Sequence, residues 1–330
     1  MTPAWVGSGG GPAAQAPPVP PADRPSWVQV WMDTIVTIGL AVPAAGAARF
    51  DAAVQRAFGW FGRVEAVCSR FDRDSEVRRL VSHVGEPVRV SPLLRETLQL
   101  GLALAGATGG AFDPTIGGLL EARGFDRDYR TGARVSSGLE SPARTSFRDV
   151  HLDPKASTVT IDRPLLLDLG ALAKGLAVDL AARDLAAAPG GVVEAGGDCV
   201  VWGRPADGRG WRVGVRHPRR AGQLVAVLGI GEGAVCTAGD YARRPAAGAQ
   251  GHHIVDPRRG GAPTAVASAT VVAPTAMVAD ALSTAATVLG PVDGPRLLTD
   301  CAVDGLLVTG DLHLAVTPGL DRLLLGPVSL

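Results

Sequence analysis

The chain has very little lysine, few aromatic residues and no excess of either charge. Only two of its 330 residues are lysines, Lys155 and Lys174, and 5% of the residues are aromatic. Lysine plus arginine and aspartate plus glutamate both number 32, so the formal net charge is zero. The charge balance therefore gives no support to a nucleic acid or an anionic membrane as the partner.

Cysteine is also scarce, and its spacing points to no known kind of site. The four cysteines are scattered, and no two of them have the spacing of a metal or redox site. We interpret them as small buried side chains in a reducing compartment, while the sequence leaves a disulfide open.

Neither a long apolar run nor an export signal is present. No stretch of about 18 residues is apolar throughout, so we expect no transmembrane helix. Residues 1–27 are rich in proline, alanine and glycine and lack a basic segment, an apolar segment and an early cysteine for lipid attachment. We expect them to form a disordered leader, and we expect the protein to be cytoplasmic.

Hydrophobic residues make up 46% of the chain, which is enough for a sizeable core, and residues 28–330 show no clear internal linker. Apolar spacing and capping signals predict helices over residues 47–70, 91–108, 171–188 and 275–289. Short β-rich runs predict strands over residues 28–42, 150–152, 158–161, 165–169, 192–194, 199–202, 211–216, 224–230, 267–273, 303–308 and 312–316. Runs of strands with a few packed helices indicate an α+β fold in a single compact domain.

Residues 165–175 read as a buried strand that runs into a helix. Asp168 would lie at the strand end, Gly170 allows a tight turn, and the helix N-terminus offers free backbone N–H groups to an anion. Lys174 lies in the first helical turns, where its ammonium can reach a phosphate. A helix cap at Asp168 and a surface ion pair between Lys174 and Asp179 remain the alternative.

Residues 109–118 are rich in glycine and contain one carboxylate, Asp113. Glycine lets the backbone approach a ligand closely, but this spacing fits neither a P-loop nor a dinucleotide fingerprint. A helix C-cap followed by a turn is the alternative interpretation.

Residues 252–284 combine a histidine pair with oxygen ligands. His253 precedes the turn at Asp256, and a histidine near a phosphoryl centre can act as a general base. Asp280 and Thr284 lie four residues apart on one face of a predicted helix, with Ser283 beside them. A carboxylate, a hydroxyl and a carbonyl suit Mg²⁺, which usually also holds substrate phosphates. Solvated or packed side chains with no ligand are the alternative.

We interpret the Gly-Asp turns at residues 193–198 and 237–241 as ordinary turn chemistry.

Taken in order, these segments resemble the ApbE family of FAD:protein FMN transferases. The resemblance is carried by Met32-Asp33-Thr34, Phe71 to Glu76, Gly110 to Thr115, Leu167 to Gly175, Gly196-Gly197-Asp198, His252 to Pro257 and Ala279 to Thr284. It spans about residues 28–290. Each motif alone is weak, but their shared order and spacing make a strong signal.

The resemblance implies an ApbE-like fold, related to the T-fold, that binds FAD and Mg²⁺. It also implies transfer of FMN to a Thr or Ser hydroxyl of a target protein, with release of AMP. Carried over by position, the FAD site would be lined by Met32, Phe71, Ala111, Phe112, Asp113, Asp168, Lys174 and Ile254. Mg²⁺ would be held by Asp280, Thr284 and the backbone oxygen of Ala171, and Ser283 stands where some members have a further carboxylate.

The catalytic assignment is our own inference from the chemistry. His253 is preferred as the group that assists deprotonation of the acceptor hydroxyl, with Asp256 as the second choice. The chain departs from the family at Asp33, where Gly is usual, at Phe71, where Tyr is common, and at Ala238, where Ser is common. Two rival functions use the same residues: an FAD pyrophosphatase that gives FMN and AMP, and a non-catalytic FAD-binding protein.

Overall fold

The computed structural model describes residues 25–138, 145–205, 210–242 and 251–330, and a large antiparallel sheet forms its centre. The sheet has eight strands in the order β1-β2-β6-β7-β10-β11-β12-β13. Their bounds are β1 Ser26–Trp31, β2 Thr34–Leu40, β6 Gly190–Ala195, β7 Asp198–Gly203, β10 Gly233–Gly239, β11 Val266–Ala273, β12 Asp304–Thr309 and β13 Leu314–Val316.

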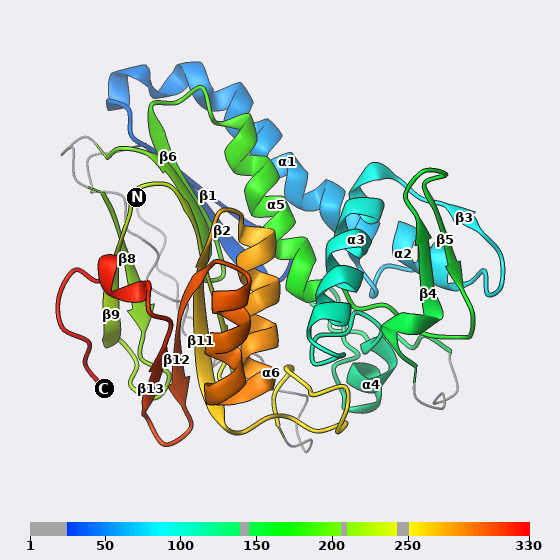
Figure 1. Cartoon of the computed structure of the whole chain (residues 1–330). Coiled ribbons are helices and arrows are strands. Elements are labelled where there is room, and N and C mark those ends of the chain that lie inside the picture. Colours follow the sequence, from blue (N-terminus) through cyan, green and yellow to red (C-terminus); the bar gives the residue numbers. More distant parts are fainter. Residues whose placement is uncertain (1–24, 139–144, 206–209, 243–250) are drawn as a thin grey trace.

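Three helices cover one face of this sheet (Figure 1). They are α1 (Asp51–Cys68), α5 (Gly170–Asp184) and α6 (Ala276–Asp300). Phe58 and Phe61 of α1 and Leu172 of α5 are fully buried in the core between helices and sheet. Each such side chain contributes roughly 1.5–3 kcal/mol through burial, so this layer anchors α5 and α6 firmly on the sheet.

A second, smaller core lies on the opposite face. The hairpin of β8 (Trp211–Arg216) and β9 (Leu224–Ile230) packs there. Successive residues of β6 serve the two cores, because Val193 belongs to the first and Val192 to the second. A strand covered on both faces is shielded from solvent, and every residue of β6 is buried, Glu194 included.

A third part stands beside the three helices (Figure 1). It contains a three-stranded sheet in the order β3-β5-β4 and three helices. Their bounds are α2 Glu76–Val81, β3 Val88–Arg89, α3 Pro92–Ala107, α4 Gly117–Ala122, β4 Val150–Asp153 and β5 Thr158–Ile161. The first turn of α5 meets this part, because a Cβ on Gly101 of α3 would lie 2.9 Å from Leu172.

Several predicted elements are confirmed, and α3 is the clearest. Ser91 is its N-cap and accepts a hydrogen bond from the Leu94 N–H at 3.3 Å, and Pro92 is its first residue. All four cysteines are free, as the simplest interpretation required, although Cys301 is exposed. Within the described part of the chain, no helix has the length and apolar character needed to span a membrane. Residues 1–24 of the predicted leader lie outside the described residues.

The prediction of one strand over residues 28–42 is wrong. The segment forms the hairpin of β1 and β2, and the turn between them gives Met32 and Asp33 φ values of 50° and 62°. Glycine or asparagine usually marks such a turn, because a Cβ disfavours positive φ. Only Asp33 belongs to a residue type that tolerates this conformation, so the turn carried a weak sequence signal.

Two other elements differ from the prediction. Residues 165–169 form no strand, because among them only Leu166 pairs, through an isolated bridge to Ile116. The predicted end of the other helix at residue 289 is confirmed, because Gly290 has φ 90° and ψ −177°, but a second helical stretch that the sequence did not predict follows it to Asp300. The sequence prediction also missed β10, α2 and α4.

Candidate active site

The side chain of Lys174 lies between two carboxylates that come from different elements. Its Nζ contacts Oδ2 of Asp198 at the start of β7 and lies 3.2 Å from Oδ2 of Asp280 in α6. The side chains of Asp198 and Asp280 are 1% and 9% exposed. Two carboxylates around one ammonium leave one negative charge in excess in a buried place, which favours a further cation.

Asp198, which the sequence did not assign to the site, is fixed in position from two sides. Its Oδ1 accepts a hydrogen bond from the Thr237 N–H of β10 at 3.2 Å. In the turn before it, the Glu194 carboxylate accepts one from the Gly197 N–H at 2.7 Å. Burial raises the pKa of Glu194, although the Gly197 N–H and the Lys174 charge lower it. The Gly-Asp turn thus supplies one of the two carboxylates around Lys174. The ion pair between Lys174 and Asp179, which was the alternative interpretation, is not among the contacts that centre on Lys174.

The N-terminus of α5 is held by Asp168. Its Oδ1 accepts a hydrogen bond from the Gly170 N–H at 3.0 Å, which is the capping role considered as an alternative. Its Oδ2 accepts one from Nε of Arg70 at 2.5 Å. Arg70 also donates to the Phe125 carbonyl at 2.5 Å, and its guanidinium lies 4.1 Å from the Phe71 ring centre. Arg70 therefore ties two predicted FAD-site residues together, and no sequence signal identified it.

Replacing Arg70 with methionine is expected to destabilise the fold by roughly 3 kcal/mol, because it breaks a buried ion pair and removes the guanidinium from the Asp168 carboxylate. Arg73 lies in the same loop and is exposed, so Arg73→Met serves as the matched control. Urea unfolding followed by tryptophan fluorescence measures both variants. Equal free energies of unfolding for the two variants would contradict a structural role for the Arg70–Asp168 pair.

The glycine-rich segment places Asp113 in a buried loop. One oxygen of Asp113 accepts hydrogen bonds from the Thr115 N–H and hydroxyl at 2.9 and 2.7 Å, and the other accepts one from the Phe147 N–H at 3.0 Å. Phe112 beside it is 5% exposed and packs in the main core. These bonds show Asp113 building the loop, while its role toward FAD stays a prediction.

Three predicted segments converge beside α6. Ala111 and Ile254 are buried and pack in one small apolar cluster with Ala238 of β10 and Val288 of α6. This cluster lies on the same helix as Asp280, two turns further along. Met32, from the β1–β2 turn, is half-buried and packs against the main core instead.

The histidine segment ends in a tight turn built by Asp256. Its Oδ1 and Oδ2 accept hydrogen bonds from Nε and Nη2 of Arg258 at 2.9 and 3.1 Å. Burial raises the pKa of Asp256, but the hydrogen bonds and charge of Arg258 outweigh this and lower it overall. A carboxylate with a lowered pKa is a weak base. Of the two candidates for the general base, half-buried His253 is therefore favoured over Asp256. His252 is buried, and its Nε2 lies 2.9 Å from the Pro263 carbonyl oxygen.

The predicted metal residues lie in the N-terminal halves of α5 and α6, the helices that carry Lys174 and Asp280. Asp280 and half-buried Thr284 are one turn apart in α6, and half-buried Ala171 is in the first turn of α5. Ser283 is fully buried, and its hydroxyl donates to the Asp280 carbonyl at 2.8 Å. Ser283 therefore supports the helix from within, and its place in the metal set stays a prediction.

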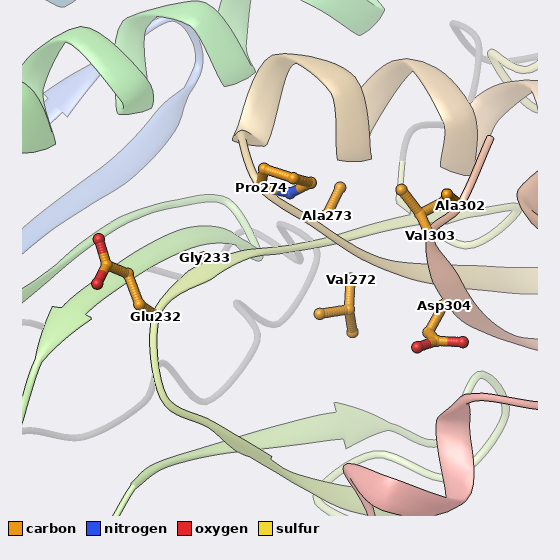
Figure 2. A pocket seen from close by; sticks show the side chains of 8 residues that line it. All are labelled: Glu232, Gly233, Val272, Ala273, Pro274, Ala302, Val303 and Asp304. Atoms are coloured by element: carbon orange, nitrogen blue, oxygen red, sulfur yellow. The ribbon is translucent and has the colours of Figure 1, made fainter.

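A separate hollow of about 370 Å³ lies at the opposite end of β10 and β11 (Figure 2). None of the predicted site residues is among its eight lining residues. Its charged side chains are two carboxylates, Glu232 and Asp304, which would repel the phosphates of FAD. We therefore place the candidate active site at Lys174 and not in this hollow.

Comparison with known proteins adds independent information. A family model described as the ApbE family matches residues 32–307. The FAD:protein FMN transferase of Rhodobacter capsulatus is 37% identical over 245 residues, which cover 71% of this chain and 46% of that protein. The FAD:protein FMN transferase of Treponema pallidum is 33% identical over 298 residues, which cover 84% of this chain and 82% of that protein. The chain thus spans about half the length of the first relative and most of the second.

Solved structures share the fold. The ApbE protein of Thermotoga maritima has a TM-score of 0.78 and 28% identity, covering 91% of this chain and 98% of that one. The flavin transferase ApbE of Vibrio cholerae has a TM-score of 0.78 and 26% identity, covering 92% of this chain and all of that one. These likenesses confirm the α+β fold of the ApbE type.

Proposed function

The chain belongs to the ApbE family, and we propose that it moves the FMN part of FAD to a hydroxyl of a target protein and releases AMP. Relatives that match 71% and 84% of this chain carry the name FAD:protein FMN transferase. One structural observation carries the proposal: Lys174 lies between Asp198 and Asp280 near the N-terminus of α5. The ammonium and the helix N-terminus attract a pyrophosphate, and the excess carboxylate attracts a metal ion.

We further propose Mg²⁺ as the metal. The donor set is made of oxygen atoms only, from the Asp280 carboxylate, the Thr284 hydroxyl and the Ala171 carbonyl, which suits a hard cation. When bound, Mg²⁺ would neutralise charge that develops on the pyrophosphate oxygens. The negative charge in excess around Lys174 fits this assignment.

The protein groups then have separate tasks in the transfer. A Thr or Ser hydroxyl oxygen of the target attacks the phosphorus that bears riboflavin, and His253 accepts the hydroxyl proton. The bond from that phosphorus to the AMP oxygen breaks, and AMP leaves with the electron pair. Lys174, held by Asp198, keeps a positive charge near the leaving phosphate. The Phe71 ring, positioned by Arg70, offers an aromatic surface for the flavin.

Cleavage of FAD tests this proposal. The purified full chain is incubated with FAD and an acceptor protein in MgCl₂ or in EDTA, and AMP is measured by liquid chromatography. We expect AMP to appear only with MgCl₂. FAD that stays whole under both conditions would contradict cleavage and favour a flavin-binding protein.

Replacing His253 with glutamine is expected to lower the turnover number by about 10²–10⁴-fold, as is typical for loss of a general base. FAD binding should remain, because glutamine fills a similar space. His151→Gln is the control, since His151 is exposed in β4 and pairs with Asp162 at 2.7 Å. The turnover number is obtained from AMP measured in samples quenched at several times. The affinity for FAD is obtained from flavin fluorescence. A full rate in His253→Gln would move the base assignment to another group.

A further inference from the structure

Asp179 of α5 holds the N-terminus of α6 with both oxygens of its carboxylate. Oδ1 accepts a hydrogen bond from the Ala276 N–H at 2.7 Å, and Oδ2 accepts one from the Met277 N–H at 2.9 Å. The first N–H groups of a helix have no partner within it, and a negative charge is favourable at that end. The local N-cap, Thr275, satisfies only the Val278 N–H, at 3.4 Å. Asp179 therefore completes the cap from another helix.

The same face of α5 brings the two helix backbones into contact. Gly175 lies one turn before Asp179, so both residues face α6. A Cβ on Gly175 would lie 2.4 Å from the Ala276 carbonyl oxygen and 2.6 Å from the Met277 nitrogen. No larger side chain fits there without movement of a backbone. The glycine contact and the two hydrogen bonds together fix where α6 starts relative to α5.

These two helices also carry the proposed site. Lys174 and Ala171 lie within one turn before Gly175 on α5, and Asp280 lies one turn after Ala276 on α6. The 3.2 Å approach of Lys174 Nζ to Asp280 Oδ2 spans the pair of helices. Mg²⁺ requires near-octahedral geometry, with oxygen ligands at about 2.0–2.1 Å from the ion. Because the proposed ligands come from both helices, a small shift of α6 relative to α5 would weaken Mg²⁺ binding.

We infer that Asp179 is a positioning residue for the metal set: it fixes the Asp280 carboxylate of α6 relative to Lys174 and the Ala171 carbonyl of α5 without touching the substrate. This inference rests on the proposed function. It assigns a role to a carboxylate that the transfer mechanism does not use.

The test replaces Asp179 with asparagine, which keeps the shape and one acceptor but turns an amide N–H₂ toward the second backbone N–H. We expect half-maximal AMP release to need roughly ten-fold more Mg²⁺, since one charge-assisted bond is lost. At saturating Mg²⁺ the KM for FAD should stay close to that of the wild type. Mn²⁺ binding, followed by the EPR signal of free Mn²⁺, should weaken by a similar factor without any turnover.

Asp184→Asn is the matched control. Asp184 lies at the end of the same helix and accepts a hydrogen bond from the Trp60 Nε1–H of α1 at 2.9 Å. Its loss should lower Tm and leave the Mg²⁺ and Mn²⁺ dependence unchanged. If Asp179→Asn lowered Tm in the same way and kept wild-type Mn²⁺ affinity, Asp179 would be merely structural and the inference would be overturned.

Three further outcomes are distinguishable. If Asp179→Asn does not fold, Asp179→Glu takes its place. This variant keeps the charge and moves it by one methylene. Its Mn²⁺ affinity and Mg²⁺ dependence are compared with those of Asp184→Asn in the same way. If the wild type binds Mn²⁺ more tightly than Asp179→Asn but releases no AMP with Mg²⁺, the proposed function fails while the positioning role stands. If the wild type releases AMP and both variants keep its Mg²⁺ dependence, the positioning role fails alone.

Discussion

Replacing Asp280 with asparagine is expected to remove Mg²⁺-dependent cleavage of FAD almost entirely. Asp280 supplies the only carboxylate of the proposed oxygen set, and asparagine offers a neutral oxygen in its place. Loss of a preorganised charge at a reacting phosphate typically costs at least ~10²–10³-fold in rate, and loss of the metal adds to this. AMP release at several MgCl₂ concentrations measures the effect.

The fold of Asp280→Asn should survive, because Lys174 keeps its contact with Asp198 and the negative charge in excess is removed. Asp293→Asn is the matched control, since Asp293 is exposed in the later part of α6 and pairs with Arg296 at 3.1 Å. It should cleave FAD at the wild-type rate. A folded Asp280→Asn with an unchanged rate and unchanged Mg²⁺ dependence would show that the metal is bound elsewhere or is not needed.

Replacing Lys174 with methionine is expected to have two separable effects. It removes the ammonium that we propose to face the pyrophosphate, and it leaves Asp198 and Asp280, whose side chains are 1% and 9% exposed, without that cation. An unpaired buried carboxylate costs about 3–5 kcal/mol, so the free energy of unfolding should fall by that order. Turnover should fall as well. Lys155→Met is the control, because Lys155 is the other lysine of the chain and lies in an exposed turn.

The double variant Lys174→Met, Asp198→Asn separates the two effects. Neutralising Asp198 removes the more buried of the two carboxylate charges that Lys174 compensates, so the free energy of unfolding should recover in part. Turnover should not recover, since the ammonium is still missing. Urea unfolding and AMP release are measured on the same samples. Recovery of turnover along with stability would show that Lys174 acts only as a structural partner of Asp198.

The sequence predicted the parts of the site that depend on local spacing. Asp280 and Thr284 lie on one helix, so their separation of four residues was enough to place them on one face. Lys174 stood out because lysine is rare in this chain and because it follows a predicted helix start. Both predictions needed no knowledge of which distant segment faces them.

The missed residues depend on contacts between distant segments. Asp198 lies in a Gly-Asp turn like many others, and only the packing of α5 against β7 brings it to Lys174. Arg70 is one of thirty arginines, and its partner Asp168 is 98 residues away. The tertiary cap by Asp179 joins residues 97 positions apart. No local pattern records such pairs.

The errors in the predicted strands also arise where the local sequence does not determine the backbone conformation. The β1–β2 turn uses Met32 and Asp33 in a conformation that other residues usually mark, so the strand prediction ran through it. The four leucines of residues 165–169 are buried in the main core, and a short buried apolar run alone does not show that its backbone forms a strand. Burial was predicted correctly there, and backbone pairing was not.

The mass of an acceptor protein after incubation with FAD tests flavin transfer most directly. A small acceptor domain with a threonine in a flavinylation-type sequence, and its Thr→Ala variant, are each incubated with the full chain and FAD in MgCl₂ or EDTA. We expect the mass of one FMN on the threonine acceptor, together with AMP, only in MgCl₂. FMN and AMP with an unlabelled acceptor would identify a pyrophosphatase, and this result would contradict the proposed transfer.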